Sequence, residues 1–189
     1  MRLFFALFPP RSRELDSLYE GLGRTGNNLK RVAPENMHFT VKFLGEVPQR
    51  LSDISRVAES VISEYDPFEM KYRDAGAFPS WRRPAVIWLG VENGELLEDM
   101  ARDLDLKLNE EIMIKKEKRP FRAHMTVARV KRGKRVDAKS IRKEMDRSID
   151  KLTSDEEAIP VRSIHLCSST LTPEGPIYER VREFRLKDR

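Results

Sequence analysis

One four-residue pattern occurs twice in this chain, as His38-Phe39-Thr40-Val41 and as His124-Met125-Thr126-Val127. The chain has only three histidines, and the probability that two of them precede a threonine at this spacing by chance is about 0.003. Each copy lies in a run of β-branched and aromatic residues that is typical of a strand. The repeat therefore predicts two related halves, each of which contributes one strand with a histidine and a threonine.

Within the first predicted strand, Met37–Gly45, side chains alternate between the two faces. His38 and Thr40 share the more polar face. The opposite face carries the apolar side chains Phe39, Val41 and Phe43, which this parity assigns to the core. Alone, such a strand could be a half-exposed edge without function; the second copy favours a functional pair.

The hydrophobic pattern predicts an alternation of strands and helices along the chain. Strands are expected over residues 3–8, 29–32, 37–45, 68–78, 83–91, 125–130, 159–171 and 177–186. Helices are expected over roughly 12–23, 49–65, 95–110 and 139–149. This order indicates an α+β fold with mainly antiparallel pairing. We expect two pseudo-symmetric lobes, each with an antiparallel sheet and flanking helices, and an active cleft between them.

The length of 189 residues is enough for one substantial core, and no low-complexity linker divides the chain. We therefore expect a single domain over residues 1–189, made of two intertwined lobes. Because the two lobes would supply both histidines, a monomer is expected.

Charge and cysteine content restrict the partners and the compartment. The net charge of +5 favours polyanionic partners without proving that they are nucleic acids. The single cysteine, Cys167, excludes an intramolecular disulfide, and the N-terminal hydrophobic run is too short for a signal peptide or a membrane span. We expect a cytoplasmic protein that does not associate with membranes.

Two opposed histidines suit acid/base chemistry at phosphorus, because one can take a proton from the attacking oxygen while the other gives one to the leaving oxygen. The hydroxyls of Thr40 and Thr126 can stabilise charge on non-bridging oxygens. Such a mechanism needs neither a metal nor a cofactor, and the sequence has no phosphate-binding glycine loop or serine-nucleophile elbow. Because histidine pairs also bind zinc, metal binding stays an alternative.

The twin pattern resembles the signature of the 2H phosphoesterase superfamily. The sequence context resembles one branch, the RNA 2′,3′-cyclic phosphodiesterases, also called 2′-5′ RNA ligases. The likeness includes an opening strand such as Met1–Phe4, the segment Pro34–Val47, the lead-in Arg119-Pro120-Phe121 and a closing stretch such as Ser168–Tyr178. Family members often have proline before the second histidine, where this chain has Ala123.

The resemblance implies a bilobal fold and hydrolysis of RNA 2′,3′-cyclic phosphate ends to 2′-phosphates, with a reverse 2′-5′ ligation. It implies RNA with such an end as partner, tRNA fragments included. By position in the motifs it implies that His38 and His124 are the catalytic pair. Substrate would be bound by Thr40, Thr126, Arg129, Phe43 and Tyr178. For Phe43 this conflicts with the core position that strand parity predicts.

Several alternatives stay open at this point. If the 3′-oxygen leaves, we take His38 as the acid and His124 as the base, although the reverse assignment is not excluded. The chain could bind RNA ends without turnover, or hydrolyse a small cyclic nucleotide or ADP-ribose 1″,2″-cyclic phosphate. The basic run at residues 131–135 is either a solvated loop or a contact for a phosphate backbone.

Overall fold

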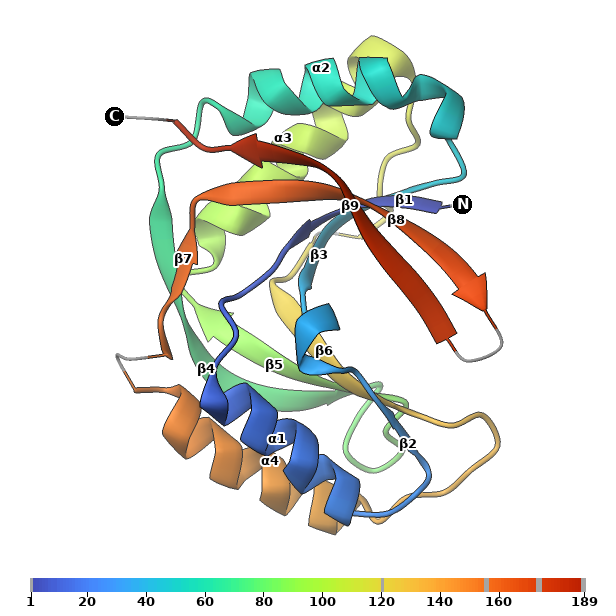
Figure 1. Ribbon diagram of the computed structural model, residues 1–189, viewed down its shortest axis with the longest axis vertical. Coiled ribbons are helices and arrows are strands. Elements are labelled where there is room, and N and C mark those ends of the chain that lie inside the picture. Colours follow the sequence, from blue (N-terminus) through green and yellow to red (C-terminus); the bar gives the residue numbers. More distant parts are fainter. Residues whose placement is uncertain (1, 120, 155–156, 173–174, 188–189) are drawn as a thin grey trace.

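The computed structural model describes residues 2–119, 121–154, 157–172 and 175–187, so residues 173–174, between the last two expected strands, lie outside the described residues. Strands and helices alternate along the chain (Figure 1). The elements in order are β1 (Arg2–Leu7), α1 (Arg13–Arg24), β2 (Leu29–Arg31), β3 (Phe39–Gly45), α2 (Leu51–Ile62), β4 (Phe68–Phe78), β5 (Val86–Glu92), α3 (Glu95–Ile112), β6 (His124–Val130), α4 (Ala138–Leu152), β7 (Ile159–Val161), β8 (Ser163–Thr172) and β9 (Gly175–Arg185). Two short 3-10 turns, Pro34–Asn36 and Pro48–Arg50, precede β3 and α2.

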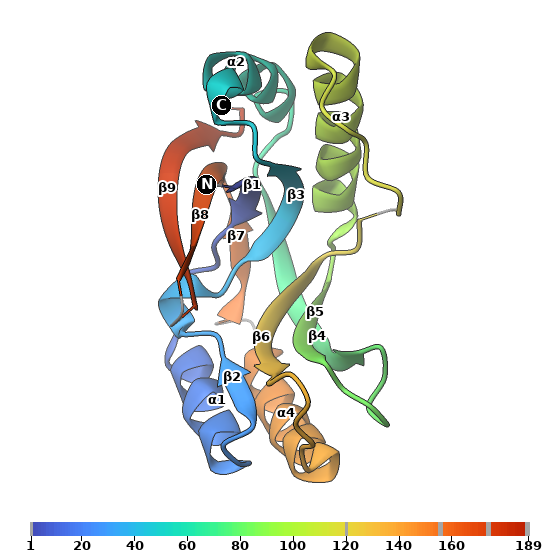
Figure 2. The same cartoon turned by 90° about the vertical axis from the view of Figure 1, so that its right-hand side faces the viewer.

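All strand pairs are antiparallel, and the strands follow the order β7-β4-β5-β6-β3-β1-β8-β9, with β2 beside β6. The strands of the two lobes belong to one continuous sheet. The lobes are joined where β3 pairs with β6, and these two strands pair at one position, Phe39 opposite Met125. In Figure 2, β3 rises towards α2 while β6 descends towards α4. The two motif strands are therefore neighbours at the centre of the molecule.

Each lobe is covered by one pair of helices. Helices α2 and α3 pack together over the β3 and β9 half, and α1 and α4 pack together over the β4 and β2 half (Figures 1 and 2). Helix α1 follows β1 of the first lobe but packs on the second lobe. Helix α3 follows β5 of the second lobe but packs on the first lobe. The predicted α+β architecture of two antiparallel lobes is confirmed, and the two crossovers join the lobes.

Local sequence explains where the helices begin and end. Ser12 caps α1, because its side chain accepts a hydrogen bond from the backbone N–H of Leu15. Helix α2 starts later than predicted because Pro48–Arg50 forms a 3-10 turn first. Helix α3 ends at Met113, which adopts a left-handed conformation with φ 58°.

One strand prediction was wrong. The run 159–171, expected as a single strand, is divided into β7 and β8 at Arg162. Strand β7 pairs with β4 in one lobe, while β8 pairs with β1 and β9 in the other. An apolar run indicates that a segment is buried, but it does not indicate where the segment changes from one partner strand to another.

Most buried apolar side chains form one core between the sheet and the helices. A smaller buried cluster on the other face of β1 contains Phe4, Ala6 and Cys167, with Phe8 and Tyr178 packed against it. Burial raises the pKa of the Cys167 thiol to about 12, so this thiol is unreactive at neutral pH. The smaller cluster lies beneath the first histidine.

Candidate active site

A β-bulge in β3 reverses the parity that the sequence suggested. Ala6 of β1 pairs with Thr40 and Phe5 pairs with Lys42, so Val41 is an extra residue without a partner on β1. An extra residue moves every later side chain to the opposite face. The prediction that Phe43 lies in the core is therefore wrong: its side chain is 63% exposed and lines the same pocket as Thr40.

The same irregularity occurs at the matching place in β6. Trp88 of β5 pairs with Thr126 and Ile87 pairs with Ala128, which leaves Val127 as the extra residue. The carbonyl of Val127 instead accepts a hydrogen bond from the backbone N–H of Val32, at 2.8 Å. As in β3, the residue three positions beyond the threonine, Arg129, lies on the pocket side.

These two strands and their neighbours form a pocket of about 340 Å³ where the lobes meet. All seven residues that the sequence singled out line it, together with five that it did not. The predicted residues are His38, Thr40, Phe43, His124, Thr126, Arg129 and Tyr178. The additional ones are Arg2, Phe4, Val32, Gly45 and Ser169.

The two imidazoles are held in the same way. Nδ1 of His38 lies 2.7 Å from the carbonyl oxygen of Asn36, and Nδ1 of His124 lies 2.7 Å from the carbonyl oxygen of Arg122. A carbonyl oxygen can only accept, so Nδ1 of each ring carries a proton. Each Nε2 is thereby left to accept a proton when the ring is neutral, or to donate one when it is charged.

Aromatic rings surround His38 on its own lobe. The centroids of Phe4, Phe8 and Tyr178 lie 5.3, 5.5 and 5.3 Å from the centroid of the His38 ring. Burial lowers the pKa of the His38 imidazole, the hydrogen bond to Asn36 opposes this shift, and the positive charge of Arg129 adds to it. In the protein without substrate, the neutral form of His38 is therefore favoured.

His124 has different neighbours. Its ring makes T-shaped contacts with Phe78 at 5.3 Å and Trp88 at 6.3 Å between centroids. The indole of Trp88 lies so close to Gly76 of β4 that a methyl group at position 76 would overlap it. Gly76 therefore allows the Trp88 ring to pack beside His124.

The five additional lining residues had weak signals in the sequence. Phe4 lies in an uninterrupted hydrophobic run, in which both faces of β1 are buried, so alternation could not assign it to the pocket. Ser169 lies opposite Arg2 on the neighbouring strand, a pairing that only the register reveals. The remaining histidine, His165, lies on β8 with its ring 5.7 Å from Phe8.

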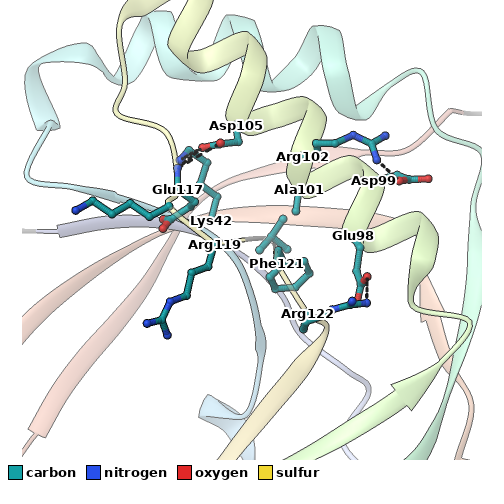
Figure 3. A pocket seen from close by; sticks show the side chains of 12 residues that line it. Lys42, Glu98, Asp99, Ala101, Arg102, Asp105, Glu117, Arg119, Phe121 and Arg122 are labelled. Atoms are coloured by element: carbon teal, nitrogen blue, oxygen red, sulfur yellow. Dashed lines mark hydrogen bonds and ion pairs between the residues drawn. The ribbon is translucent and has the colours of Figure 1, made fainter.

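A larger cavity of about 510 Å³ lies elsewhere, between β3, α3 and the segment before β6, and neither motif histidine lines it. The buried ammonium of Lys42 is 2.5 Å from Asp105 there, and Asp105 also accepts a hydrogen bond from the backbone N–H of Glu117, at 3.0 Å (Figure 3). Figure 3 further shows the ion pairs of Arg122 with Glu98 and of Arg102 with Asp99. The cationic and anionic groups of this cavity largely pair with each other, and they tie β3 to the segment leading to His124.

The described residues contain neither a metal-binding cluster nor a membrane-spanning helix. No group of three or more histidine, cysteine or acidic side chains among them has the geometry to hold a metal ion. None of the helices in the described part of the chain is both long and apolar enough to cross a membrane.

Comparison with known proteins agrees with this architecture. The family described as "LigT like Phosphoesterase" matches the chain twice, over residues 7–88 and 89–178. Two relatives named RNA 2′,3′-cyclic phosphodiesterase are similar: one from Methanothermobacter thermautotrophicus (39% identity, 84% of this chain and 83% of the relative) and one from Archaeoglobus fulgidus (37%, 97% and 99%). A solved structure of a Thermus thermophilus protein has a TM-score of 0.77 at 28% identity, covering 99% of this chain and 98% of that one. This chain belongs to the LigT-like phosphoesterase family.

Proposed function

We propose that this protein hydrolyses RNA ends that carry a 2′,3′-cyclic phosphate, leaving a 2′-phosphate, by acid/base catalysis with His38 and His124. The observation that carries the proposal is the matched pair of imidazoles, each fixed through Nδ1 and both lining one shared pocket. The names of the relatives support the choice of substrate.

In the proposed reaction, one histidine takes a proton from water as its oxygen attacks phosphorus. The bond between phosphorus and the 3′-oxygen breaks, and the other histidine donates a proton to that oxygen. Thr40, Thr126 and Arg129 stabilise the negative charge on the non-bridging oxygens. When a 5′-hydroxyl attacks phosphorus in place of water, the bond to the 3′-oxygen breaks in the same way, and a 2′-5′ linkage forms.

The distribution of aromatic rings supports His38 as the acid. Phe4, Phe43 and Tyr178 gather on the His38 side of the pocket, with 6.0 Å between the centroids of Phe4 and Phe43 and 5.4 Å between those of Phe4 and Tyr178. We take the leaving 3′-oxygen of a nucleoside stacked there to be the oxygen that faces His38, and in-line attack then places water on the side of His124. The negative charge of bound phosphate favours the protonated form of His38, against the effect of burial.

Three further features belong to the proposal. The protein needs no metal, because the two imidazoles perform both proton transfers. It acts as a monomer, because one chain supplies both histidines. It works in the cytoplasm, where its single cysteine stays reduced.

The test is incubation of the purified protein, in EDTA, with an oligoribonucleotide that ends in a 2′,3′-cyclic phosphate. Conversion to the 2′-phosphate is expected. Formation of the 3′-phosphate would contradict the assigned leaving group, and loss of activity in EDTA would contradict metal independence. Binding without conversion, or hydrolysis of small cyclic phosphates alone, would replace the proposed substrate.

A further inference from the structure

An open groove lies at the end of the second lobe, between residues 79–84 and residues 134–138. It has a volume of about 960 Å³, and its lining includes the cationic side chains Arg82, Arg83, Lys134 and Arg135. None of the lining residues, all of which belong to the described part of the chain, is acidic. We refer to it as the basic groove.

Hydrogen bonds position both walls of the basic groove. The N–H of Val130 donates to the carbonyl of Ala85 at 2.9 Å, which places the two loops side by side. On the second wall, the side-chain amide of Asn28 donates to the carbonyl of Arg135 at 2.8 Å, and the N–H of Lys131 donates to the carbonyl of Asn28 at 2.9 Å. Asn28 therefore contacts both ends of the basic run at 131–135.

The cations of the groove are unpaired within the described residues. Arg82, Arg83, Lys134 and Arg135 are exposed, and none of them forms an ion pair there. On the adjacent helix α4, by contrast, Arg142 pairs with Asp146 and Arg147 with Glu144. The nearest acidic residue in sequence, Asp137, instead accepts hydrogen bonds from Lys139 and Ser140 at the start of α4. The groove thus keeps a local excess of positive charge that its own fold does not neutralise.

Strand β6 connects the groove to the candidate active site. Arg129 of this strand lines the active-site pocket with His38 and Tyr178. Strand β6 ends one residue later, at Val130, and the basic run 131–135 leads from there into the second wall of the groove at Lys134. Cationic residues therefore follow one another along the chain from the pocket to the groove, at positions 129, 131, 132, 134 and 135.

We propose that the basic groove binds the sugar–phosphate backbone of the RNA strand that ends in the cyclic phosphate, on the 5′ side of the reacting nucleotide. This inference rests on the proposed function and narrows it: the substrate is an oligonucleotide that spans the pocket and the groove, and a mononucleotide lacks half of the contacts. Binding through phosphates carries no sequence preference, so strand length decides selectivity.

The test compares the double variant R83Q/R135Q with the charge-matched control R13Q/K143Q, whose substituted side chains are exposed on α1 and α4. Binding of a fluorescent oligoribonucleotide of about ten nucleotides ending in a 2′-phosphate is measured by anisotropy at several salt concentrations. At low salt we expect about tenfold weaker binding for R83Q/R135Q, and a salt slope reduced by about 0.7 for each lost phosphate contact. The control should match the wild type.

Kinetics provide the second measurement. The ratio of kcat/KM for a cyclic-phosphate oligonucleotide to that for a 2′,3′-cyclic mononucleotide should fall about tenfold in R83Q/R135Q. An equal fall for both substrates, equal losses in the control, or undiminished oligonucleotide binding would overturn the proposal. So would a defect confined to joining of a 5′-hydroxyl RNA, which would assign the groove to the second strand. If the wild type hydrolyses neither substrate, the proposed function fails, and the binding measurement still decides the groove.

Discussion

Phe43 and Arg129 occupy matching positions in the two lobes, each three residues beyond the threonine of its motif and each placed on the pocket side by a bulge at the residue after that threonine. Both lobes thus use a β-bulge to place this residue on the pocket side, but the two side chains differ in chemistry. The first lobe contributes an aromatic ring, which suits a base. The second contributes a guanidinium, which suits a phosphate.

Paired substitutions in β3 test the bulge. Phe39→Ala removes a fully buried ring and should lower the free energy of unfolding by about 3–5 kcal/mol. Phe43→Ala should change it by less than about 0.5 kcal/mol, because that ring is 63% exposed. Stacking on a base is worth about 1–3 kcal/mol, so Phe43→Ala should raise KM at least about fivefold. Denaturant unfolding and steady-state kinetics measure both effects; comparable destabilisation by the two substitutions would contradict the bulged register.

The residues of the pocket show how much of the site can be predicted from the sequence. The two histidines and two threonines were predictable because they belong to the repeated pattern, and the helices were predictable from apolar periodicity. The side chain of Phe43 was assigned to the wrong face because a single extra residue, Val41, reverses strand parity without a sequence signal. Phe4 was missed because both faces of its strand are buried.

Removal of either motif histidine should abolish most of the catalysis without unfolding the protein. Because each imidazole performs one proton transfer, His38→Ala and His124→Ala should each lower kcat by about 10²- to 10⁴-fold. His165→Gln is the matched control, since His165 lies outside the pocket lining, and it should retain most activity. Rates are measured alongside circular dichroism; a folded variant with nearly full activity would exclude that histidine from the chemistry.

The protonation of His38 should depend on the charge of Arg129. Burial and this guanidinium both lower the pKa of His38, so its NMR titration should have a midpoint below the usual 6.5. Arg129→Gln should raise the midpoint, whereas Arg129→Lys should leave it low. A midpoint unaffected by Arg129→Gln would exclude this coupling.

The lowered pKa of His38 also has a consequence for stability. At pH values between the folded-state pKa of His38 and 6.5, the unfolded chain binds more protons at this residue than the folded chain does. The free energy of unfolding therefore rises with pH in that window, and above the window it no longer depends on the titration of His38. Substitution by glutamine at position 38 should therefore flatten the dependence of unfolding free energy on pH just below 6.5. An unchanged dependence would contradict the assignment.

Gly76 should support activity through Trp88. A methyl group at position 76 would overlap the indole, which lies 5.2 Å from Phe78 and 6.3 Å from His124 between centroids. Gly76→Ala should therefore displace Trp88 and lower kcat, by about tenfold if a proton-transfer group moves out of reach. Adding Trp88→Phe provides room for the methyl group and should restore part of the rate. The absence of such rescue would indicate that Gly76 acts independently of Trp88.

The buried ammonium of Lys42 should be more important for stability than exposed cations are. Its side chain is 1% exposed and the carboxylate of Asp105, 2.5 Å away, is 17% exposed, so Lys42→Met leaves Asp105 poorly solvated and unpaired. We expect a loss of about 3 kcal/mol in the free energy of unfolding, which a second substitution, Asp105→Leu, should partly reverse. The control is Arg56→Met, which breaks the exposed pair with Glu111 at 2.8 Å and should cost less than about 1 kcal/mol. Similar losses in Lys42→Met and Arg56→Met, measured by urea unfolding, would show that burial adds nothing to this pair. A loss confined to Lys42→Met would identify the ion pair as the contact that fixes β3 to α3 and, through Glu117, to the segment that delivers His124.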